Sequence, residues 1–203
     1  MVNQSLKEKM LSLKEKLLSL KGKFLPLSLT AFVILADQIV KMIIVKAKPE
    51  YGLIKDVFNN GFIWIYHVRN KAIAFSLGDN LPEVIKPFIF VVVPLLVLGF
   101  LLWYYFKSNE FSKLQRWAAA GIIGGGLGNI IDRIFRIDGV VDFISVNLYG
   151  LLGMSRWPTF NIADSSVVVS CILLFITMFV PLKKTEKPQI TEEKKVIEDR
   201  TNE

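Results

Sequence analysis

The amino-acid sequence predicts an all-α membrane protein with four transmembrane helices, both termini cytoplasmic, and a small β-rich segment on the extracytoplasmic side. The prediction rests on apolar content, on four long apolar stretches, and on the placement of lysine and arginine. Of the 203 residues 52% are hydrophobic and the mean hydropathy is +0.44, which is high for a soluble domain. The expected spans are residues 26–46, 84–106, 114–132 and 162–182.

The four stretches differ in how strongly hydropathy supports them. Crossing the hydrocarbon core takes about 20 apolar residues, and the runs Pro87–Phe106 and Ser165–Leu182 contain no charge. The first stretch is interrupted by Asp37, Gln38 and Lys41, and the third is built largely on alanine and glycine. Small residues let membrane helices approach closely. The second and fourth spans are therefore the clearest.

The orientation of the spans follows from their basic residues. Segments 1–25, 107–116 and 183–203 together carry 15 lysines and arginines in 56 residues, whereas segments 47–83 and 132–160 carry 7 in 66. Cytoplasmic loops are enriched in these residues, so both termini are predicted to face the cytoplasm. The net charge of +7 then reflects topology, and no motif of nucleic-acid-binding proteins accompanies it.

Three regions flank or interrupt the spans. Residues 1–25 form an amphipathic basic segment that we expect to lie on the anionic inner leaflet, ahead of the four-span domain, residues 26–182. The external segment, 47–83, contains a strand pattern over 62–69 and should form a small sheet on the membrane surface. Residues 183–203 carry six basic and six acidic side chains and are expected to be disordered.

The sequence predicts neither a metal nor a cofactor. A single cysteine, Cys171, excludes an intramolecular disulfide, and a single histidine, His67, leaves no Cys/His set of metal ligands. The glycines at 124–128 lack the Lys-Ser/Thr ending of a phosphate-binding loop.

Two carboxylates lie where a membrane protein can least tolerate them. Asp164 opens the last apolar run, and Asp142 lies in the predicted loop that leads to it. An ionisable group near the hydrocarbon is costly and indicates a functional site, and two of them suggest a pair that shares one proton. Asn161 could also cap the last helix, which would place Asp164 at its favourable third position.

Other polar residues gather at the same outer ends of the spans. The spacing of Asp37 and Lys41 predicts a stabilising pair one helical turn apart, for which a structural role is the better interpretation. Asn129 and Asp132 share one helix face, and Asp132 with Arg133 could form an ion pair that anchors a helix end or could serve the site.

Five short motifs occur in order along the chain, and together they resemble those of bacterial lipoprotein signal peptidases, the signal peptidase II family. They are Asp37-Gln-Ile-Val-Lys41, Asn70-Lys-Ala-Ile-Ala-Phe-Ser76, Gly125-Gly-Leu-Gly-Asn129-Ile-Ile-Asp132-Arg133, Gly139-Val-Val-Asp142-Phe-Ile144 and Phe160-Asn161-Ile-Ala-Asp164-Ser165. The resemblance covers residues 27–182. It departs from the family pattern at Ala72, where glycine is usual, and in a slightly longer loop from Arg133 to Gly139.

The resemblance implies an aspartic endopeptidase of the bacterial cytoplasmic (inner) membrane, with its active site on the extracytoplasmic side. Its substrate would be a prolipoprotein cut just before a diacylglyceryl-modified cysteine, with lipid as the other partner, no nucleic acid, and a monomeric state. Asp142 and Asp164 would be catalytic, and neither is assigned the acid role. The implied supporting residues are Asn70, Asn129, Arg133 and Asn161, and the structural polar residues are Asp37, Lys41 and Asp132.

Three other interpretations compete with this one. A prepilin-type or presenilin-like protease would carry Gly-x-Gly-Asp, but Gly128 precedes Asn129 and that motif does not occur. A small transporter could use buried acids to bind ions, but such proteins often have repeated spans, and no convincing repeat is present. An inactive membrane scaffold would not need five ordered motifs.

Overall fold

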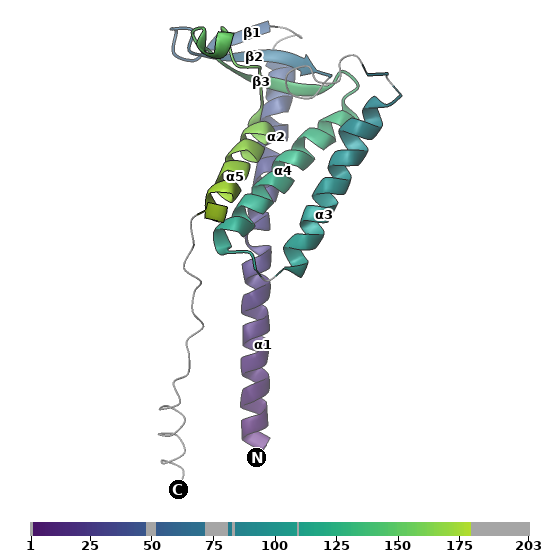
Figure 1. The fold of residues 1–203 in the computed structure, drawn as a ribbon, viewed down its shortest axis with the longest axis vertical. Helices are drawn as coiled ribbons and strands as arrows, with labels where there is room; N and C mark the ends of the chain where they lie inside the picture. The colour runs from purple at the N-terminus through teal and green to yellow at the C-terminus, as the bar shows by residue number, and fades with distance from the viewer. Residues whose placement is uncertain (1, 48–51, 72–80, 83, 109, 180–203) are drawn as a thin grey trace.

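The computed structural model describes the chain except residues 1, 48–51, 72–80, 83, 109 and 180–203. Its elements form a helix bundle with a small sheet at one end (Figure 1). In chain order they are α1 (Val2–Phe24), α2 (Leu27–Ala47), β1 (Gly52–Asp56), β2 (Ile63–Asn70), the π-helical turn η2 (Phe88–Val92), α3 (Val93–Lys107), α4 (Lys113–Phe135), β3 (Val140–Val146), the 3-10 turn η3 (Leu151–Gly153) and α5 (Ile162–Phe179).

Helix α4 is the centre of the bundle, because it contacts α2, α3 and α5. Its glycines make the close approach possible. A Cβ atom added to Gly125 would lie 2.3 Å from the carbonyl oxygen of Ala163 on α5, and one added to Gly124 would lie 3.0 Å from the Cα atom of Thr30 on α2. The small residues of the third predicted span are therefore explained by packing against other helices.

Three described helical stretches are long and apolar enough to cross a membrane: Leu20–Ala47, Phe88–Lys107 and Ile162–Phe179. They correspond to the first, second and fourth predicted spans. Helix α4 is not among them, although it lies beside them in the bundle (Figure 1). Because much of its surface is buried against the other helices, α4 has less need of apolar side chains toward lipid.

The sheet is antiparallel, with strand order β1-β2-β3. The prediction of a sheet is confirmed, but two details of it were wrong. Asp142 was predicted in a loop, whereas it lies within β3 opposite Val68 of β2, and β3 comes from outside the external segment 47–83 to which the sheet had been confined. The β-branched and aromatic residues around Asp142 favour a strand. Gly139, with φ +101°, leads into β3 where a Cβ atom would lie 2.5 Å from the carbonyl oxygen of Asn70.

A small apolar core attaches the sheet to the bundle. Val141 and Phe143 of β3 are buried against Ile44 near the end of α2. Asp142, between them in the sequence, is thereby held at the junction of sheet and bundle.

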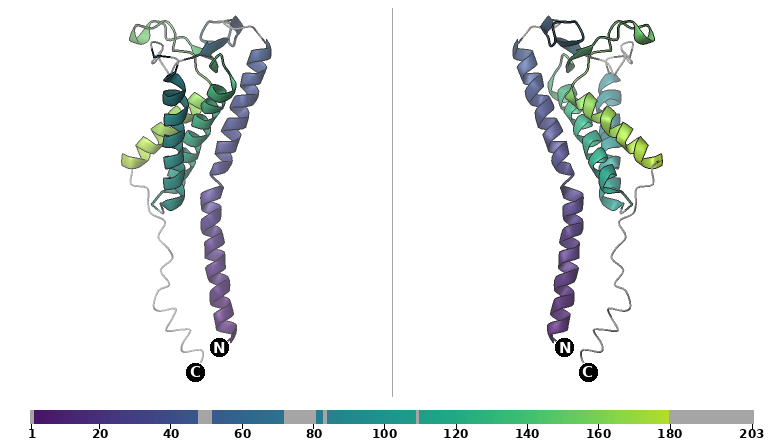
Figure 2. Two further views of the ribbon diagram at one scale, coloured as in Figure 1. Left: turned by 90° about the vertical axis from the view of Figure 1, so that its right-hand side faces the viewer. Right: turned by 90° about the vertical axis from the view of Figure 1, so that its left-hand side faces the viewer.

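Helix α1 extends from the opposite end of the bundle and continues roughly in the direction of α2 (Figure 2). The expectation that residues 1–25 lie on a membrane surface stays a prediction. The tail 183–203 and Ala72 lie outside the described residues. Helix α4 continues to Phe135, so the first part of the loop expected from Arg133 to Gly139 is helical.

Candidate active site

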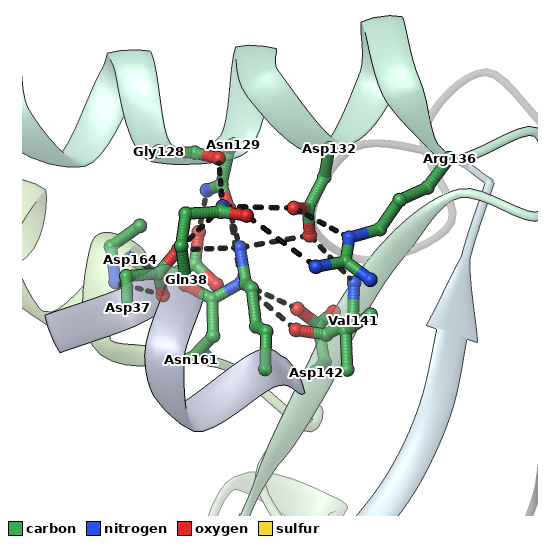
Figure 3. Close-up of polar contacts among 12 residues, drawn as sticks. Asp37, Gln38, Gly128, Asn129, Asp132, Arg136, Val141, Asp142, Asn161 and Asp164 are labelled. Atoms are coloured by element: carbon green, nitrogen blue, oxygen red, sulfur yellow. Dashed lines mark hydrogen bonds and ion pairs between the residues drawn. The ribbon is translucent and has the colours of Figure 1, made fainter. Parts of the chain in front are cut away.

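The two suspected carboxylates lie in a layer of polar side chains between β3 and the helices of the bundle (Figure 3). Asp142 is only 3% exposed. Its Oδ1 atom accepts a hydrogen bond from Asn161 Nδ2 at 2.7 Å, and its Oδ2 atom accepts one from Asn70 Nδ2 at 2.9 Å. Asn70 pairs with Val140 in the sheet, two residues before Asp142, so strand pairing brings the two side chains together diagonally.

Asp164 lies in the first turn of α5, and Asn161 caps that helix as predicted. The Asn161 Oδ1 atom accepts a hydrogen bond from the Asp164 backbone N–H at 2.9 Å, while Asp164 Oδ2 accepts one from the Asn161 N–H at 3.1 Å. This reciprocal arrangement is a capping box. The other oxygen of Asp164, Oδ1, accepts a hydrogen bond from Asn129 Nδ2 at 2.7 Å.

Asn161 is therefore more than a cap. It is fully buried, and its Nδ2 group donates both to Asp142 and to Asn129 Oδ1, the latter at 3.0 Å. Asp142 and Asp164 are thus bound by the same asparagine and linked again through a second amide. Three neutral amides, those of Asn70, Asn129 and Asn161, donate to these two carboxylates.

A second group of charges, which we call the ion cluster, lies beside this pair and consists of Asp37, Lys41, Asp132 and Arg136. The Lys41 Nζ atom lies 2.7 Å from Asp37 Oδ2 and 3.0 Å from Asp132 Oδ2, with all three side chains fully buried. Lys41 also donates to Asn129 Oδ1 at 3.0 Å. The predicted pairing of Asp37 with Lys41 is confirmed.

The ion cluster also binds the backbone next to both candidate catalytic residues. Asp37 Oδ1 accepts a hydrogen bond from the N–H of Ala163 at 3.0 Å, and Asp132 Oδ2 accepts one from the N–H of Val141 at 3.1 Å. Ala163 directly precedes Asp164 and Val141 directly precedes Asp142. The cluster therefore fixes the backbone from which each of the two carboxylates projects.

Two members of the polar layer were missed as site residues. Arg136 Nε lies 3.0 Å from Asp132 Oδ1, and Gln38 Nε2 donates to the same oxygen at 2.9 Å. Arg136 had been assigned to a loop, although its spacing of four from Asp132 is that of a helical ion pair. Gln38 also donates to the carbonyl of Gly128 at 3.0 Å, so it holds α2 against α4.

Arg133 lies on α4 beside the ion cluster. The centre of its guanidinium group is 5.1 Å from the centre of the Phe90 ring on η2, a cation–π contact. Phe90 is one of the buried residues of that turn. The π-helical turn thus contacts one of the predicted site residues, as such turns often do near functional sites.

Burial raises the pKa of Asp142 to about 7. The hydrogen bond from Asn70 favours the charged form and opposes this rise, whereas the negative charge of Asp164 adds to it. A carboxyl group with such a pKa holds or releases a proton near neutral pH. Among the described residues no group of three or more His, Cys, Asp or Glu could hold a metal ion.

The fold and the polar site first identify the class of protein, because both are consistent with a membrane enzyme. A solved bacterial membrane enzyme superimposes on the chain with a TM-score of 0.65 and 28% identity, covering 81% of this chain and 94% of its own. A second gives a TM-score of 0.64 with 27% identity, covering 77% and 94%. The protein is accordingly a multi-pass membrane protein.

The family follows from sequence comparison. The model of the family described as signal peptidase (SPase) II matches residues 29–180. The lipoprotein signal peptidase of Treponema denticola is 42% identical over 165 residues, covering 80% of this chain and 92% of that protein. That of Treponema pallidum is 40% identical over 159 residues, covering 78% and 84%. The chain belongs to the signal peptidase II family, a family of membrane proteases.

Proposed function

We propose that this protein is an aspartic endopeptidase that removes the signal peptide from prolipoproteins carrying a diacylglyceryl-modified cysteine. Asp142 and Asp164 are its catalytic residues. The relatives named above are lipoprotein signal peptidases, and one observation within the site carries the proposal. Asn161 is hydrogen-bonded to both aspartates, so the two belong to one polar site.

Asp142 holds the shared proton in the resting enzyme. Its side chain is buried and accepts hydrogen bonds from two amides, and the loss of water on burial disfavours its charged form. Asp164 lies at a helix N-terminus, where a negative charge is favourable. The two environments separate the roles of an acid and a base.

The first chemical step adds water to the scissile carbonyl. Asp164 takes one proton from the water, the oxygen of that water forms a bond to the carbonyl carbon, and Asp142 gives its proton to the carbonyl oxygen. The product is a neutral tetrahedral diol, with Asp164 protonated and Asp142 ionised.

The second step breaks the peptide bond. Asp164 gives its proton to the amide nitrogen, the carbon–nitrogen bond breaks, and Asp142 takes a proton from one diol hydroxyl as the carbonyl re-forms. The products are the carboxyl end of the signal peptide and the free amino group of the lipidated cysteine. Both aspartates return to their starting states, and no metal or cofactor takes part.

Asn70, Asn129 and Asn161 hold the carboxylates in this arrangement through the amide hydrogen bonds described above. Arg133 orients a carbonyl of the extended substrate, because its guanidinium group carries a permanent charge and several donors. Asp37, Lys41 and Asp132 have a structural role.

The proposal includes a topology. Four helices, α2 to α5, span the bacterial inner membrane, and both termini are cytoplasmic, as the bias of lysine and arginine requires. The sheet and the two aspartates then lie on the extracytoplasmic side. The acyl chains of the substrate stay in the lipid while its peptide bond reaches the site, and the enzyme acts as a monomer.

The test is cleavage of a lipidated precursor by the purified enzyme reconstituted in lipid. We expect Asp142→Asn and Asp164→Asn to abolish cleavage without a change in the fold, measured by thermal denaturation. A precursor whose lipid-bearing cysteine is replaced by serine should remain uncut. An Asp164→Asn enzyme that still cleaved the lipidated precursor at the normal rate would contradict the assignment.

A further inference from the structure

Helix α1 contains a seven-residue repeat that the peptidase site does not use. Residues 3–9, 10–16 and 17–23 read Asn-Gln-Ser-Leu-Lys-Glu-Lys, Met-Leu-Ser-Leu-Lys-Glu-Lys and Leu-Leu-Ser-Leu-Lys-Gly-Lys. The family model begins only at residue 29, so this repeat lies outside the matched region. In the structure it forms one continuous helix that points away from the bundle (Figure 2).

The repeat gives α1 an exposed apolar stripe. Its residues are spaced alternately by four and three, which aligns them along one side of a helix. Their side chains are between 43% and 70% exposed. They are Leu6, Met10, Leu13, Leu17, Leu20 and Phe24. A continuous apolar surface of this kind indicates a contact with lipid or with another protein.

The charges beside the stripe disfavour a second copy of α1 as the partner. Lysines flank the stripe on both sides. At 3.6 residues per turn they lie about 40–60° around the helix axis from the nearest residue of the stripe. Lys9 and Lys14 represent the two sides, and both are exposed. In a two-stranded coiled coil these flanking positions face one another across the interface, so the pairing would place lysine against lysine.

The lysines on both sides of the stripe fit an anionic lipid surface, because the aliphatic part of lysine lies along the apolar layer while its ammonium group reaches the head groups.

The C-terminal end of α1 is fixed to the bundle. Lys23 Nζ donates to the carbonyl of Phe106 at 2.8 Å, Tyr105 donates to the carbonyl of Lys23, and the rings of Phe24 and Phe106 are 5.5 Å apart. These contacts hold the last turn of α1 to the end of α3. They lie at the end of the bundle opposite the sheet, where the helices leave the membrane.

A weak point in the helix immediately precedes this attachment. Gly22 stands where the two earlier repeats have glutamate, and nothing lies within 4 Å of a Cβ atom added there. Glycine in a helix is less favourable than alanine because its backbone is freer. Packing therefore does not require a glycine at this position, whereas the freer backbone of glycine would allow the helix to bend there.

We propose that α1 bends at Gly22 and lies with its apolar stripe on the anionic lipid surface of the membrane face opposite the sheet. Because α1 leaves the bundle at that face, the proposal holds whichever side of the membrane the face is on. It is independent of the chemistry proposed for Asp142 and Asp164.

The test uses the full-length protein reconstituted in phosphatidylcholine vesicles with and without phosphatidylglycerol. Cys171 is replaced by alanine, and single cysteines carrying an environment-sensitive dye are placed at Leu13 and Leu17. Ser12 and Ser19, whose backbone positions the repeat puts away from the stripe, receive the control labels. With phosphatidylglycerol, the emission of the stripe labels should shift to shorter wavelength and that of the control labels should not.

A charge-reversed variant separates lipid charge from apolar contact alone. Replacing Lys9, Lys14 and Lys21 with glutamate should abolish the shift, and replacing the same three with arginine should keep it. Gly22→Ala should reduce the shift. Stripe labels that stay water-exposed in both lipids would overturn the proposal. So would stripe labels that are shielded in detergent without lipid and crosslink between two copies, because that result identifies a second chain as the partner.

Discussion

The polar layer contains two pairs of carboxylates that are bound by different kinds of partner. Asp37 and Asp132 are bound by the cations of the ion cluster, with Lys41 between them at 2.7 and 3.0 Å. Asp142 and Asp164, in the same polar layer, are bound by the neutral amides of asparagines and by a backbone N–H.

This difference separates a structural role from a chemical one. A buried carboxylate beside a cation can remain ionised, because the opposite charge compensates for lost water. Two neighbouring carboxylates cannot both ionise cheaply when burial disfavours the charged form of one of them, so one of the two keeps a proton. In the proposed mechanism the amide-bound pair supplies this proton for catalysis, and the ion cluster holds the backbone beside it.

Making the same substitution in each pair gives the largest expected contrast. Asp142→Asn should abolish measurable cleavage, a loss of at least the about 10²–10⁴-fold that general acid–base catalysis contributes. Its stability should change little, since one lost hydrogen bond of about 1 kcal/mol is offset by the removal of a carboxyl group that is costly to ionise. Asp37→Asn should lower the melting temperature clearly, whereas its cleavage rate per folded molecule should fall far less than that of Asp142→Asn. Equal effects of the two substitutions on both measurements would remove the distinction between the pairs.

Removing the central cation should destabilise the protein strongly. Lys41→Met leaves Asp37 without its partner cation and deprives Asp132 of one of two, and breaking a buried ion pair from one side costs about 3–5 kcal/mol. Thermal or denaturant unfolding in detergent would measure this loss.

The double variant Lys41→Met/Asp37→Asn provides the matched control. It removes one of the uncompensated charges, while Asp132 still has Arg136 at 3.0 Å. It should therefore be more stable than Lys41→Met alone. If it is less stable, the two effects would be independent, and the ion cluster would not act as a unit.

A smaller effect is expected when the packing of α4 against α5, the helix that contains Asp164, is disturbed. Gly125→Ala places a Cβ atom 2.3 Å from the carbonyl oxygen of Ala163, so α5 must move away from α4. Overpacking of this kind costs about 1–3 kcal/mol, and the shift should weaken the bond from Asn129 to Asp164 and slow cleavage.

Gly99→Ala is the control, because Gly99 is an exposed helical glycine with nothing within 4 Å of an added Cβ. It should leave cleavage unchanged and raise stability slightly, by up to about 1 kcal/mol. Equal losses from the two substitutions would indicate a general sensitivity of the helices to alanine.

The sequence predicted the parts of this arrangement that depend on local spacing. The pairing of Asp37 with Lys41 and the cap formed by Asn161 both lie within single helices, where positions three or four apart meet. The apolar runs likewise identified three of the bundle helices. Helix α4 was less clear because its residues are chosen for contact with other helices.

The parts that escaped prediction depend on contacts distant in sequence. The strand that carries Asp142 pairs with β2 about 70 residues earlier, and the local pattern between Gly139 and Phe160 was taken for a loop. Gln38 on α2 donates a hydrogen bond to Asp132 on α4, 94 residues later in the chain. Nothing in the spacing of α2 indicates that Asp37 would bind the N–H of Ala163, because that contact exists only once α2 and α5 have packed.

The amide-bound pair makes a further prediction about pH. Since the pKa of Asp142 is raised from 3.8 to about 7, the folded protein binds a proton between these values that the unfolded chain has released. Stability from this group therefore falls as the pH rises through that window, and cleavage that requires the protonated acid falls as the pH passes about 7.

Asn70→Ala tests this most finely. Its amide donates to Asp142 Oδ2 at 2.9 Å and favours the charged form, so its removal should move the alkaline fall in kcat to higher pH. A hydrogen bond of about 1 kcal/mol corresponds to roughly 0.5–1 pH unit. Asn60→Ala, in the exposed turn where Asn60 Oδ1 accepts from the N–H of Phe62, should leave the midpoint unchanged. A midpoint that moved to lower pH in Asn70→Ala would mean that Asp142 is not the proton-holding acid, and the roles of the two aspartates would have to be exchanged.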